Sequence, residues 1–117
     1  MKYYKAIILP MGQRIVSVID TKHNQSYALP NWENGNADFS WGYSGTGVSN
    51  LAKSILKDLQ DIDLEDYEDV GGDLWKKVFF LKDNLLSAIS QNKGWTFSAE
   101  EIEGATLPND QEPRYDN

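Results

Sequence analysis

The chain has 117 residues, of which 40% are hydrophobic and 25% are charged, and its formal net charge is −7. These values predict a single folded domain with a modest core, and they exclude a disordered chain. There is no cysteine, which excludes disulfide bonds and cysteine-based metal sites. The acidic balance argues against direct nucleic-acid binding, because neutralising phosphates requires clustered lysine and arginine.

The first residues do not have the pattern of an export signal or a membrane span. Only four apolar residues, 6–9, precede Pro10. A signal peptide needs a longer apolar region, and a membrane helix needs about 20 such residues. We therefore expect a cytoplasmic protein that makes no contact with a membrane.

The first part of the chain predicts strands. Residues 3–9 and 14–20 are rich in β-branched and aromatic side chains and are separated by a short loop, which is typical of a β-hairpin. Residues 26–29 predict a short third strand that ends at Pro30. Residues 31–38 predict a polar loop.

A long amphipathic helix is predicted over residues 48–62. Its apolar side chains recur at alternating spacings of three and four residues, which is the period of a helix with one buried face. Thr46 or Gly47 is the expected cap. A single apolar stripe of this kind predicts that the helix covers one face of the sheet.

A second helix is predicted to begin with Asp73 as its cap, after a pair of glycines. Its apolar stripe consists of Leu74, Trp75, Val78, Phe79, Leu85, Leu86 and Ile89. Gly94 is placed for a left-handed C-terminal cap after this helix. We interpret Trp75 and Phe79 as core residues, together with Trp95 and Phe97. Phe80 lies off the stripe, so an exposed Phe80 would offer a surface for self-association.

The last part of the chain predicts a short helix and a tail. Residues 95–97 form a short extended piece, and Ser98 and Glu101 have the spacing of a capping box for a brief helix that ends by Gly104. Residues 105–117 have no period and predict a flexible acidic tail. Strands followed by helices predict an α+β domain over residues 1–104, with a small antiparallel sheet packed against two amphipathic helices.

The segment 39–47 reads Phe-Ser-Trp-Gly-Tyr-Ser-Gly-Thr-Gly and leads directly into the first predicted helix. A phosphate-binding loop of the Walker type would require lysine at Val48. A serine nucleophile elbow centred on Ser44 would require glycine at Thr46, and no sequence feature places the single histidine, His23, beside that serine. The segment therefore does not predict a hydrolase, and we expect no catalytic residue.

A binding role for this segment is compatible with the sequence. Backbone N–H groups beside a helix start attract anions, because the helix dipole is positive there. Aromatic side chains nearby would stack on a ring, and a lysine one turn into the helix would assist. The candidate ligand-binding residues are Trp41, Tyr43, Ser44, Gly45, Thr46, Gly47, Ser49, Asn50 and Lys53. The alternative is that the glycines only form a turn while Trp41 packs in the core.

Seven of the eighteen acidic residues lie between Asp58 and Asp69. An EF-hand loop that starts at Asp61 would have Asp66 where glycine is needed and Gly72 where glutamate is needed, so calcium is not predicted. We expect no metal ion and no cofactor. A solvated helix end explains the acidic run. The alternative is an acidic face that imitates DNA phosphates and binds a protein.

The string 39–47, followed by the apolar pairs 51–52 and 55–56, resembles the signature of the small proteins grouped as domain of unknown function 6166. The resemblance continues in the phenylalanine-containing second helix and in residues 94–102. It covers about residues 3–103. The string is long and ordered, which makes it more specific than a glycine pattern alone.

The chain departs from that family pattern at two places. The family usually has a glycine soon after its first tyrosine, where this chain has Tyr4-Lys5-Ala6, and it often has proline at the first helical position, where this chain has Val48. The resemblance implies occurrence in bacteria, archaea and their phages. It implies no catalytic residue.

The leading hypothesis is a non-enzymatic binding protein of bacterial or phage origin. It would capture a phosphorylated nucleotide or nucleotide-like signal at the glycine-rich loop, and a small homo-oligomer is compatible with this role. The alternative hypothesis is an acidic inhibitor of the phage anti-defence or DNA-mimic type, which would bind a host protein through residues 58–69. A hydrolase ranks last, for want of a base, a metal cluster or a nucleophile with a partner.

Overall fold

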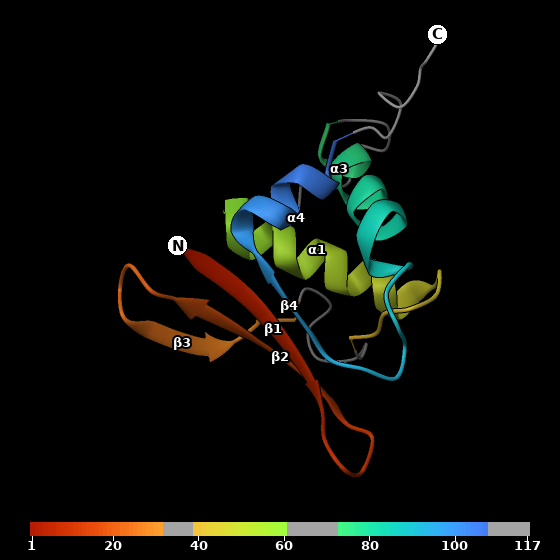
Figure 1. Cartoon of the computed structure of the whole chain (residues 1–117). Coiled ribbons are helices and arrows are strands. Elements are labelled where there is room, and N and C mark those ends of the chain that lie inside the picture. Colours follow the sequence, from red (N-terminus) through yellow and green to blue (C-terminus); the bar gives the residue numbers. More distant parts are fainter. Residues whose placement is uncertain (32–38, 61–72, 108–117) are drawn as a thin grey trace, which may run out of the picture.

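The computed structural model describes residues 1–31, 39–60 and 73–107. These residues form an α+β domain with one four-stranded antiparallel sheet in the order β3-β2-β1-β4 (Figure 1). The strands are β1 (Lys2–Ile8), β2 (Arg14–Asp20), β3 (Gln25–Ala28) and β4 (Trp95–Ser98). The predicted hairpin and third strand are confirmed. The extended piece near the end of the chain is a full fourth strand, which places chain segments about ninety residues apart side by side.

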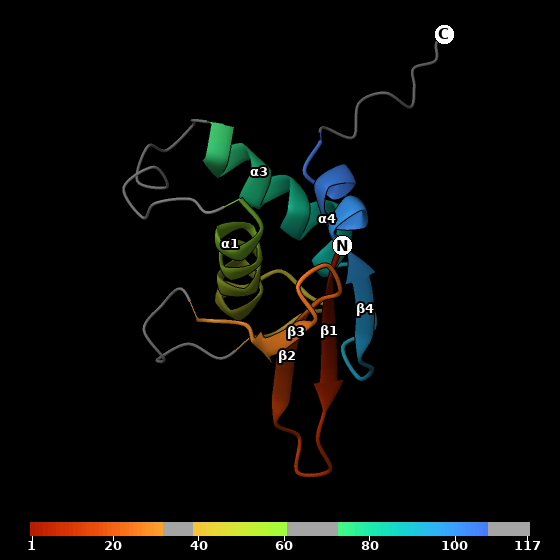
Figure 2. The same cartoon turned by 90° about the vertical axis from the view of Figure 1, so that its left-hand side faces the viewer.

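Within the described ranges, three α-helices accompany the sheet. They are α1 (Thr46–Gln60), α3 (Asp73–Leu81) and α4 (Ala99–Ala105), and a π-helical segment η1 (Lys82–Leu86) continues α3. Figures 1 and 2 show α1 lying across one side of the sheet, with α3 on the far side of α1 and α4 near the end of β4. The α1 helix begins at Thr46, and Gly45 accepts its first hydrogen bond from the Ser49 N–H (3.0 Å). Gly45 therefore precedes the helix as its cap residue, one position earlier than predicted.

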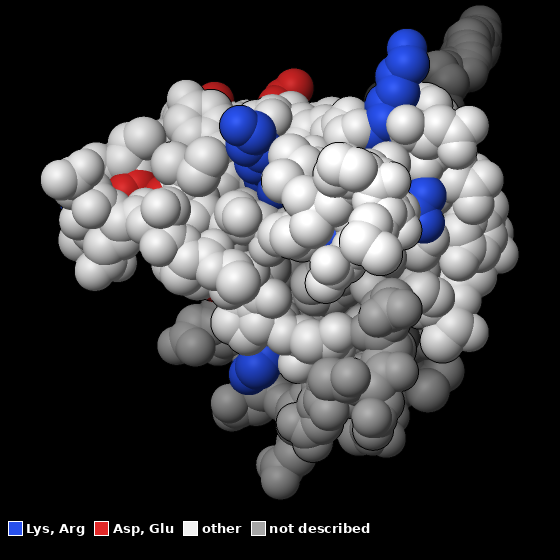
Figure 3. Space-filling model, turned by 90° about the horizontal axis from the view of Figure 1, so that it is seen from below, with Lys and Arg blue, Asp and Glu red and all other residues white. Residues whose placement is uncertain are grey.

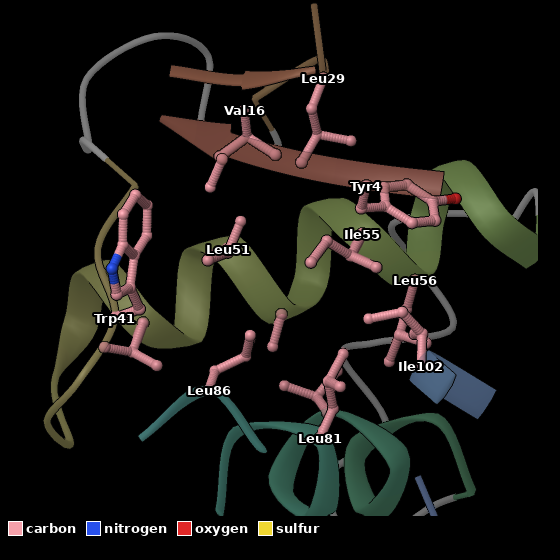
Figure 4. Packing of buried hydrophobic residues seen from close by; sticks show 14 of the residues in the cluster. Tyr4, Val16, Leu29, Trp41, Leu51, Ile55, Leu56, Leu81, Leu86 and Ile102 are labelled. Atoms are coloured by element: carbon pink, nitrogen blue, oxygen red, sulfur yellow. The ribbon is translucent and has the colours of Figure 1, made fainter. Parts of the chain in front are cut away.

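The core lies around α1. Strand side chains from one face of the sheet meet α1 from above, and Leu81 and Leu86 meet it from below (Figure 4). The sheet contributes alternate residues, because successive side chains on a strand point to opposite faces. The buried apolar side chains of the strands and of α1 are Tyr4, Ala6, Val16, Val18, Val48, Leu51, Ala52, Ile55 and Leu56. This confirms the amphipathic period predicted for α1.

The second predicted helix does not continue to Ile89 as a regular α-helix. The N–H of Ser87 donates to the carbonyl of Lys82, five residues earlier, over 2.9 Å. This wider turn is a π-type turn. It allows Leu81 and Leu86 to be fully buried together, although they are five residues apart. The apolar positions predicted beyond Leu81 are nevertheless confirmed, because Leu86 is fully buried and Leu85 and Ile89 pack against the core.

Gly94 does not have the left-handed conformation that was predicted for it. Its φ lies outside the positive range, and a side chain there would overlap the backbone carbonyl of Ala6 on β1. Glycine is required at this position because the chain passes close to β1 just before it enters β4. The residue therefore serves close packing of two backbone segments and not the end of a helix.

The predicted capping box at the start of α4 is confirmed. The Glu101 N–H donates to Oγ of Ser98 (3.1 Å), and the Ser98 N–H donates to the carboxylate of Glu101 (2.8 Å). The helix ends at Ala105, where the Nδ2 of Asn84 donates to the carbonyls of Ala105 (3.1 Å) and Leu107 (3.0 Å). The chain therefore stays in contact with η1 as far as Leu107. The rest of the predicted tail lies outside the described residues. Within the described ranges, no helix has the length and apolar character needed to cross a membrane.

Candidate functional site

Trp41 belongs to the core and not to a ligand surface. Its side chain is fully buried, and its indole N–H donates to the carbonyl of Lys93 over 2.9 Å. The Trp41 and Trp95 rings make an edge-to-face contact, with centroids 5.5 Å apart. The Arg14 guanidinium lies 4.9 Å from the centre of the Trp41 ring. The prediction that Trp41 stacks on a ligand is therefore wrong, and the alternative that it packs in the core is confirmed.

The glycine-rich loop is held against the π-helical segment at Gly42. This residue has a φ of +86°, and its N–H donates to the carbonyl of Leu86 over 2.8 Å. The added Cβ of any other residue would come within 2.7 Å of the backbone nitrogen of Gln91. Gly42 is therefore required by the fold, because the loop packs there against the segment that follows η1.

The rest of the loop is accessible. Tyr43 is 41% exposed, and its ring lies so close to Gly45 that an added Cβ there would be 2.6 Å from the ring carbon Cε2. Ser44 and Thr46 are exposed, and Gly47 is partly exposed. These residues surround the first turn of α1, whose N–H groups have no acceptor within the helix. This part of the predicted site is placed where a ligand can reach it.

Of two further predicted site residues, Asn50 is buried and Lys53 is accessible. Asn50 is buried, and its Nδ2 donates to Oδ1 of Asn31, in the segment after β3, over 3.1 Å. Asn50 therefore supports the fold. This differs from the prediction, which placed it among the ligand-binding residues. Lys53 is partly exposed and follows Ser49 by one turn on the same face of α1.

Lys82 brings a positive charge to the start of α1. Its Nζ donates to Oγ of Ser49 over 3.3 Å. Ser49 lies three residues after Thr46, so it stands about 4.5 Å along the helix axis from the first residue of α1. The N-terminus of a helix carries the equivalent of about half a positive charge. A lysine and the positive end of a helix dipole therefore meet at the same place.

A hollow of about 170 Å³ lies beside this lysine. It is lined by Ser49, Trp75, Val78, Phe79 and Lys82. The four residues of α3 and η1 among these have helical spacings of three, one and three, which place them on one face. The hollow therefore combines a hydroxyl, an ammonium group and two aromatic rings, contributed by α1 on one side and by α3 with η1 on the other.

The aromatic side chains of α3 differ from their predicted positions. Phe79 was assigned to the core, but it is 44% exposed, and Trp75 is partly exposed. Their rings are nearly parallel, with an angle of 8° and centroids 6.0 Å apart. Phe80 is the more buried member of the Phe79–Phe80 pair, which reverses the prediction that Phe80 would be the exposed one.

A second polar cluster joins the sheet to the last turns of α1. The carboxylate of Asp58 accepts hydrogen bonds from the hydroxyls of Tyr4 (2.7 Å) and Tyr27 (2.6 Å) and from Nζ of Lys2 (3.2 Å). Its side chain is only 10% exposed. A hollow of about 190 Å³ adjoins it, lined by Pro30, Ser54, Lys57 and Asp58. The three donors come from β1 and β3, so one carboxylate connects two strands to the helix.

This cluster keeps its tyrosines protonated. Burial, together with the hydrogen bond and the negative charge of Asp58, raises the pKa of Tyr4 and that of Tyr27 above their ordinary value. Partial burial alone would lower the pKa of Lys2, but Tyr27 and Asp58 raise it overall. A phenol with a raised pKa is a poor base or nucleophile at neutral pH. The cluster therefore has the character of a structural connection.

The raised tyrosine pKa values predict a loss of stability in alkali. A group whose pKa is higher in the folded than in the unfolded state stabilises the fold below its unfolded pKa, which is about 10 for tyrosine. Above that pH, the unfolded chain releases protons that the folded chain retains. The free energy of unfolding should then fall by up to about 1.4 kcal/mol per pH unit for each such group.

Urea denaturation between pH 8 and pH 11 tests this prediction with the wild type and Tyr4→Phe. The variant retains Lys2 and Tyr27, whose raised pKa values act in the same direction. We expect a shallower decline in the variant above pH 10. Parallel declines in the two proteins would contradict the assignment of this effect to Tyr4.

Of the seven acidic residues between Asp58 and Asp69, only Asp58 lies in the described ranges. Its carboxylate points inward to the tyrosines, so Asp58 does not belong to an acidic surface. The other acidic residues of the run, from Asp61 to Asp69, and the rejected EF-hand positions lie outside the described residues. The hypothesis of an acidic inhibitor therefore stays a prediction.

His23 lies in the turn between β2 and β3, as predicted, and its side chain is 63% exposed. Its Nδ1 lies 2.8 Å from Oδ2 of Asp20, and this contact lowers the pKa of the Asp20 carboxyl. In the part of the chain that the structure describes, no hydrogen bond joins His23 to a serine or threonine hydroxyl. The histidine and the loop serine Ser44 are therefore not brought together as a catalytic pair.

The outer face of the sheet carries a further, open hollow. Its volume is about 430 Å³, and it is lined by apolar and polar side chains that include Lys5, Ile7, Ser17, Ile19 and Ser26. It follows from the alternation of strand side chains, since these residues alternate with the buried ones. Figure 3 shows a face on which the lysine and arginine side chains stand apart, with uncharged surface between them. The described part of that face carries no continuous basic patch.

Comparisons with known proteins were made at three levels. A scan against protein-family models, a search of curated proteins and a search of solved structures each found no match to this chain.

The sequence did not indicate Lys82 or the Asp58 cluster as sites. Lys82 continues the face of α3 that carries Trp75 and Phe79, at spacings of seven and three residues. A lysine aligned with two aromatic residues was a usable signal, but the aromatic residues had been assigned to the core. The partners of Asp58 lie more than thirty residues away in the sequence, and local spacing contains no information about such contacts.

Proposed function

We propose that the protein is a non-enzymatic binding protein that captures a small phosphorylated ligand, a nucleotide or nucleotide-like signal, at the N-terminal end of α1. The observation that carries the proposal is the placement of Lys82 beside Ser49 at that end of the helix. The exposed residues of the glycine-rich loop, Ser44 and Thr46, would complete the site.

The electrostatics of this end of α1 support an anionic ligand. A cation beside the positive end of a helix dipole is unfavourable, by roughly 0.3–1 kcal/mol at an exposed position. Among the described residues, no carboxylate forms an ion pair with Lys82, since the ion pairs there are Lys2–Asp58 and His23–Asp20. A bound phosphate would interact favourably with both the lysine and the helix N–H groups.

A binding role is also favoured over a catalytic one. The hydroxyls and the carboxylate of the Tyr4–Asp58 cluster are bonded to each other, and His23 is bonded to Asp20 on the surface. The resemblance to domain of unknown function 6166, which would place the protein in bacteria or phages, stays a prediction and assigns no activity. Binding of a phosphorylated ligand is therefore the function we propose.

The test is calorimetric titration with 5′-AMP, 5′-GMP and ADP. Lys82→Met removes the charge but keeps an apolar side chain of similar length, and we expect it to weaken binding at least tenfold, or by about 1.4 kcal/mol, as for a lost charged hydrogen bond. The matched control is Lys76→Met, which removes an exposed lysine from α3, the helix that η1 continues. Failure of the wild type to bind any of the three compounds would overturn the proposal, as would equal weakening by the two substitutions.

A further inference from the structure

The aromatic side chains of Trp75 and Phe79 on α3 are only partly covered by the rest of the domain. Phe79 leaves 44% of its surface in water, although Val78 and Leu81 on the same helix are buried. It lies nearly parallel to Trp75 and meets the edge of Phe80, with centroids 5.5 Å apart. These two contacts hold the Phe79 ring in place, so it offers a preformed aromatic face.

The ring lies at a short distance from the proposed phosphate site. Phe79 and Lys82 line the same hollow and are separated by three residues on one helical face, a spacing that places Cβ atoms about 5–6 Å apart. A ligand that contacts both must therefore carry its aromatic ring close to its phosphate. The 170 Å³ of the hollow is also less than the roughly 300–1,000 Å³ typical of drug-sized ligands.

We propose that Phe79 and Trp75 form a stacking platform for the base of a nucleoside monophosphate whose phosphate is held by Lys82 and Ser49. This inference rests on the proposed function and deepens it. It names the ligand class, in which a single sugar separates base and phosphate, and it moves the aromatic contact from the glycine-rich loop to α3. A ring that stacks on this platform gains binding energy without reading the identity of the base, because every base has a π face.

The test compares titrations of 5′-AMP, adenosine and inorganic phosphate with the wild type and Phe79→Leu. Leucine keeps an apolar side chain but removes the aromatic face, and Phe79 is exposed enough for the substitution to leave the fold intact. We expect the affinity for 5′-AMP to fall about tenfold, as for the loss of one base–aromatic contact. The affinity for inorganic phosphate should not change.

Tyr43→Leu is the matched variant on the glycine-rich loop, since Tyr43 has a similar exposed fraction of 41%. It should leave the affinity for 5′-AMP unchanged. If Tyr43→Leu weakens 5′-AMP binding and Phe79→Leu does not, the platform on α3 is refuted. Binding of 5′-AMP that depends on Lys82 but not on Phe79 would overturn this inference while leaving the proposed function intact. No binding of 5′-AMP, 5′-GMP or ADP by the wild type would overturn both.

Discussion

Replacing Gly42 with alanine is expected to lower the free energy of unfolding by about 3 kcal/mol. Two effects add at this position. The φ of +86° is unfavourable for a residue with a Cβ, and that Cβ would lie 2.6 Å from the α-carbon of Gln91. The neighbouring atoms belong to the backbone, so they cannot move aside without shifting the chain between η1 and β4.

Gly12→Ala is the matched control for this prediction. Gly12 has a φ of +89°, but an added Cβ there has no atom within 4 Å. It should therefore cost only the conformational part, about 1 kcal/mol. Urea denaturation of the two variants separates strain from overlap. Equal losses in the two proteins would show that Gln91 does not press against Gly42 in solution.

This result would also affect how the glycine-rich loop is interpreted. The first glycine of the loop is required by contact with Gln91 and by the hydrogen bond to Leu86, and neither involves a ligand. The motif therefore serves the fold at its beginning and leaves only its later residues, from Ser44 onward, for binding. Loss of stability on Gly42→Ala cannot be used as evidence for a ligand site.

Replacing Asp58 with alanine is the second change for which we expect a large effect, a loss of about 3 kcal/mol in the free energy of unfolding. The substitution removes the acceptor of three hydrogen bonds. The hydroxyl of Tyr4 would then be left without its partner in a side chain that is fully buried. An unsatisfied buried polar group costs more than the hydrogen bond contributes when it is made.

Two further variants examine this cluster. Asp83→Ala removes an exposed carboxylate from η1 and should change stability by less than about 0.5 kcal/mol. In a double-mutant cycle, Tyr4→Phe should destabilise the wild type but have a much smaller effect in the Asp58→Ala background, because the hydroxyl has already lost its acceptor. Additive effects of the two substitutions would contradict the direct contact.

The Asp58 cluster bears on how the two halves of the domain are joined. It ties β1 and β3 to α1 at the end of the helix opposite the proposed binding site. The buried side chains of Leu51 and Ile55, which Figure 4 shows along α1, come from the helical segment between Ser49 and Asp58. The helix that presents the phosphate site is thus fixed to the sheet by polar contacts at one end and by apolar packing along its length.

The features that the sequence determined by itself are local. The hairpin follows from two β-rich runs and the short loop between them, α1 follows from its apolar period, and the box at Ser98 and Glu101 follows from two residues three apart. Each signal lies within a few residues of the structure that it specifies. Backbone sterics and local hydrogen bonds therefore decide these elements before distant contacts form.

Only the tertiary structure decided which side chains meet. Leu81, which was not on the predicted stripe, is fully buried, whereas Phe79, which was on it, is 44% exposed. Trp41 became a core residue because the segment before β4 offers its indole a carbonyl acceptor at Lys93. Lys82 reached Ser49 because α3 packs on α1. These contacts join residues far apart in the chain, and a sequence pattern specifies which face of an element is apolar but not what that face meets.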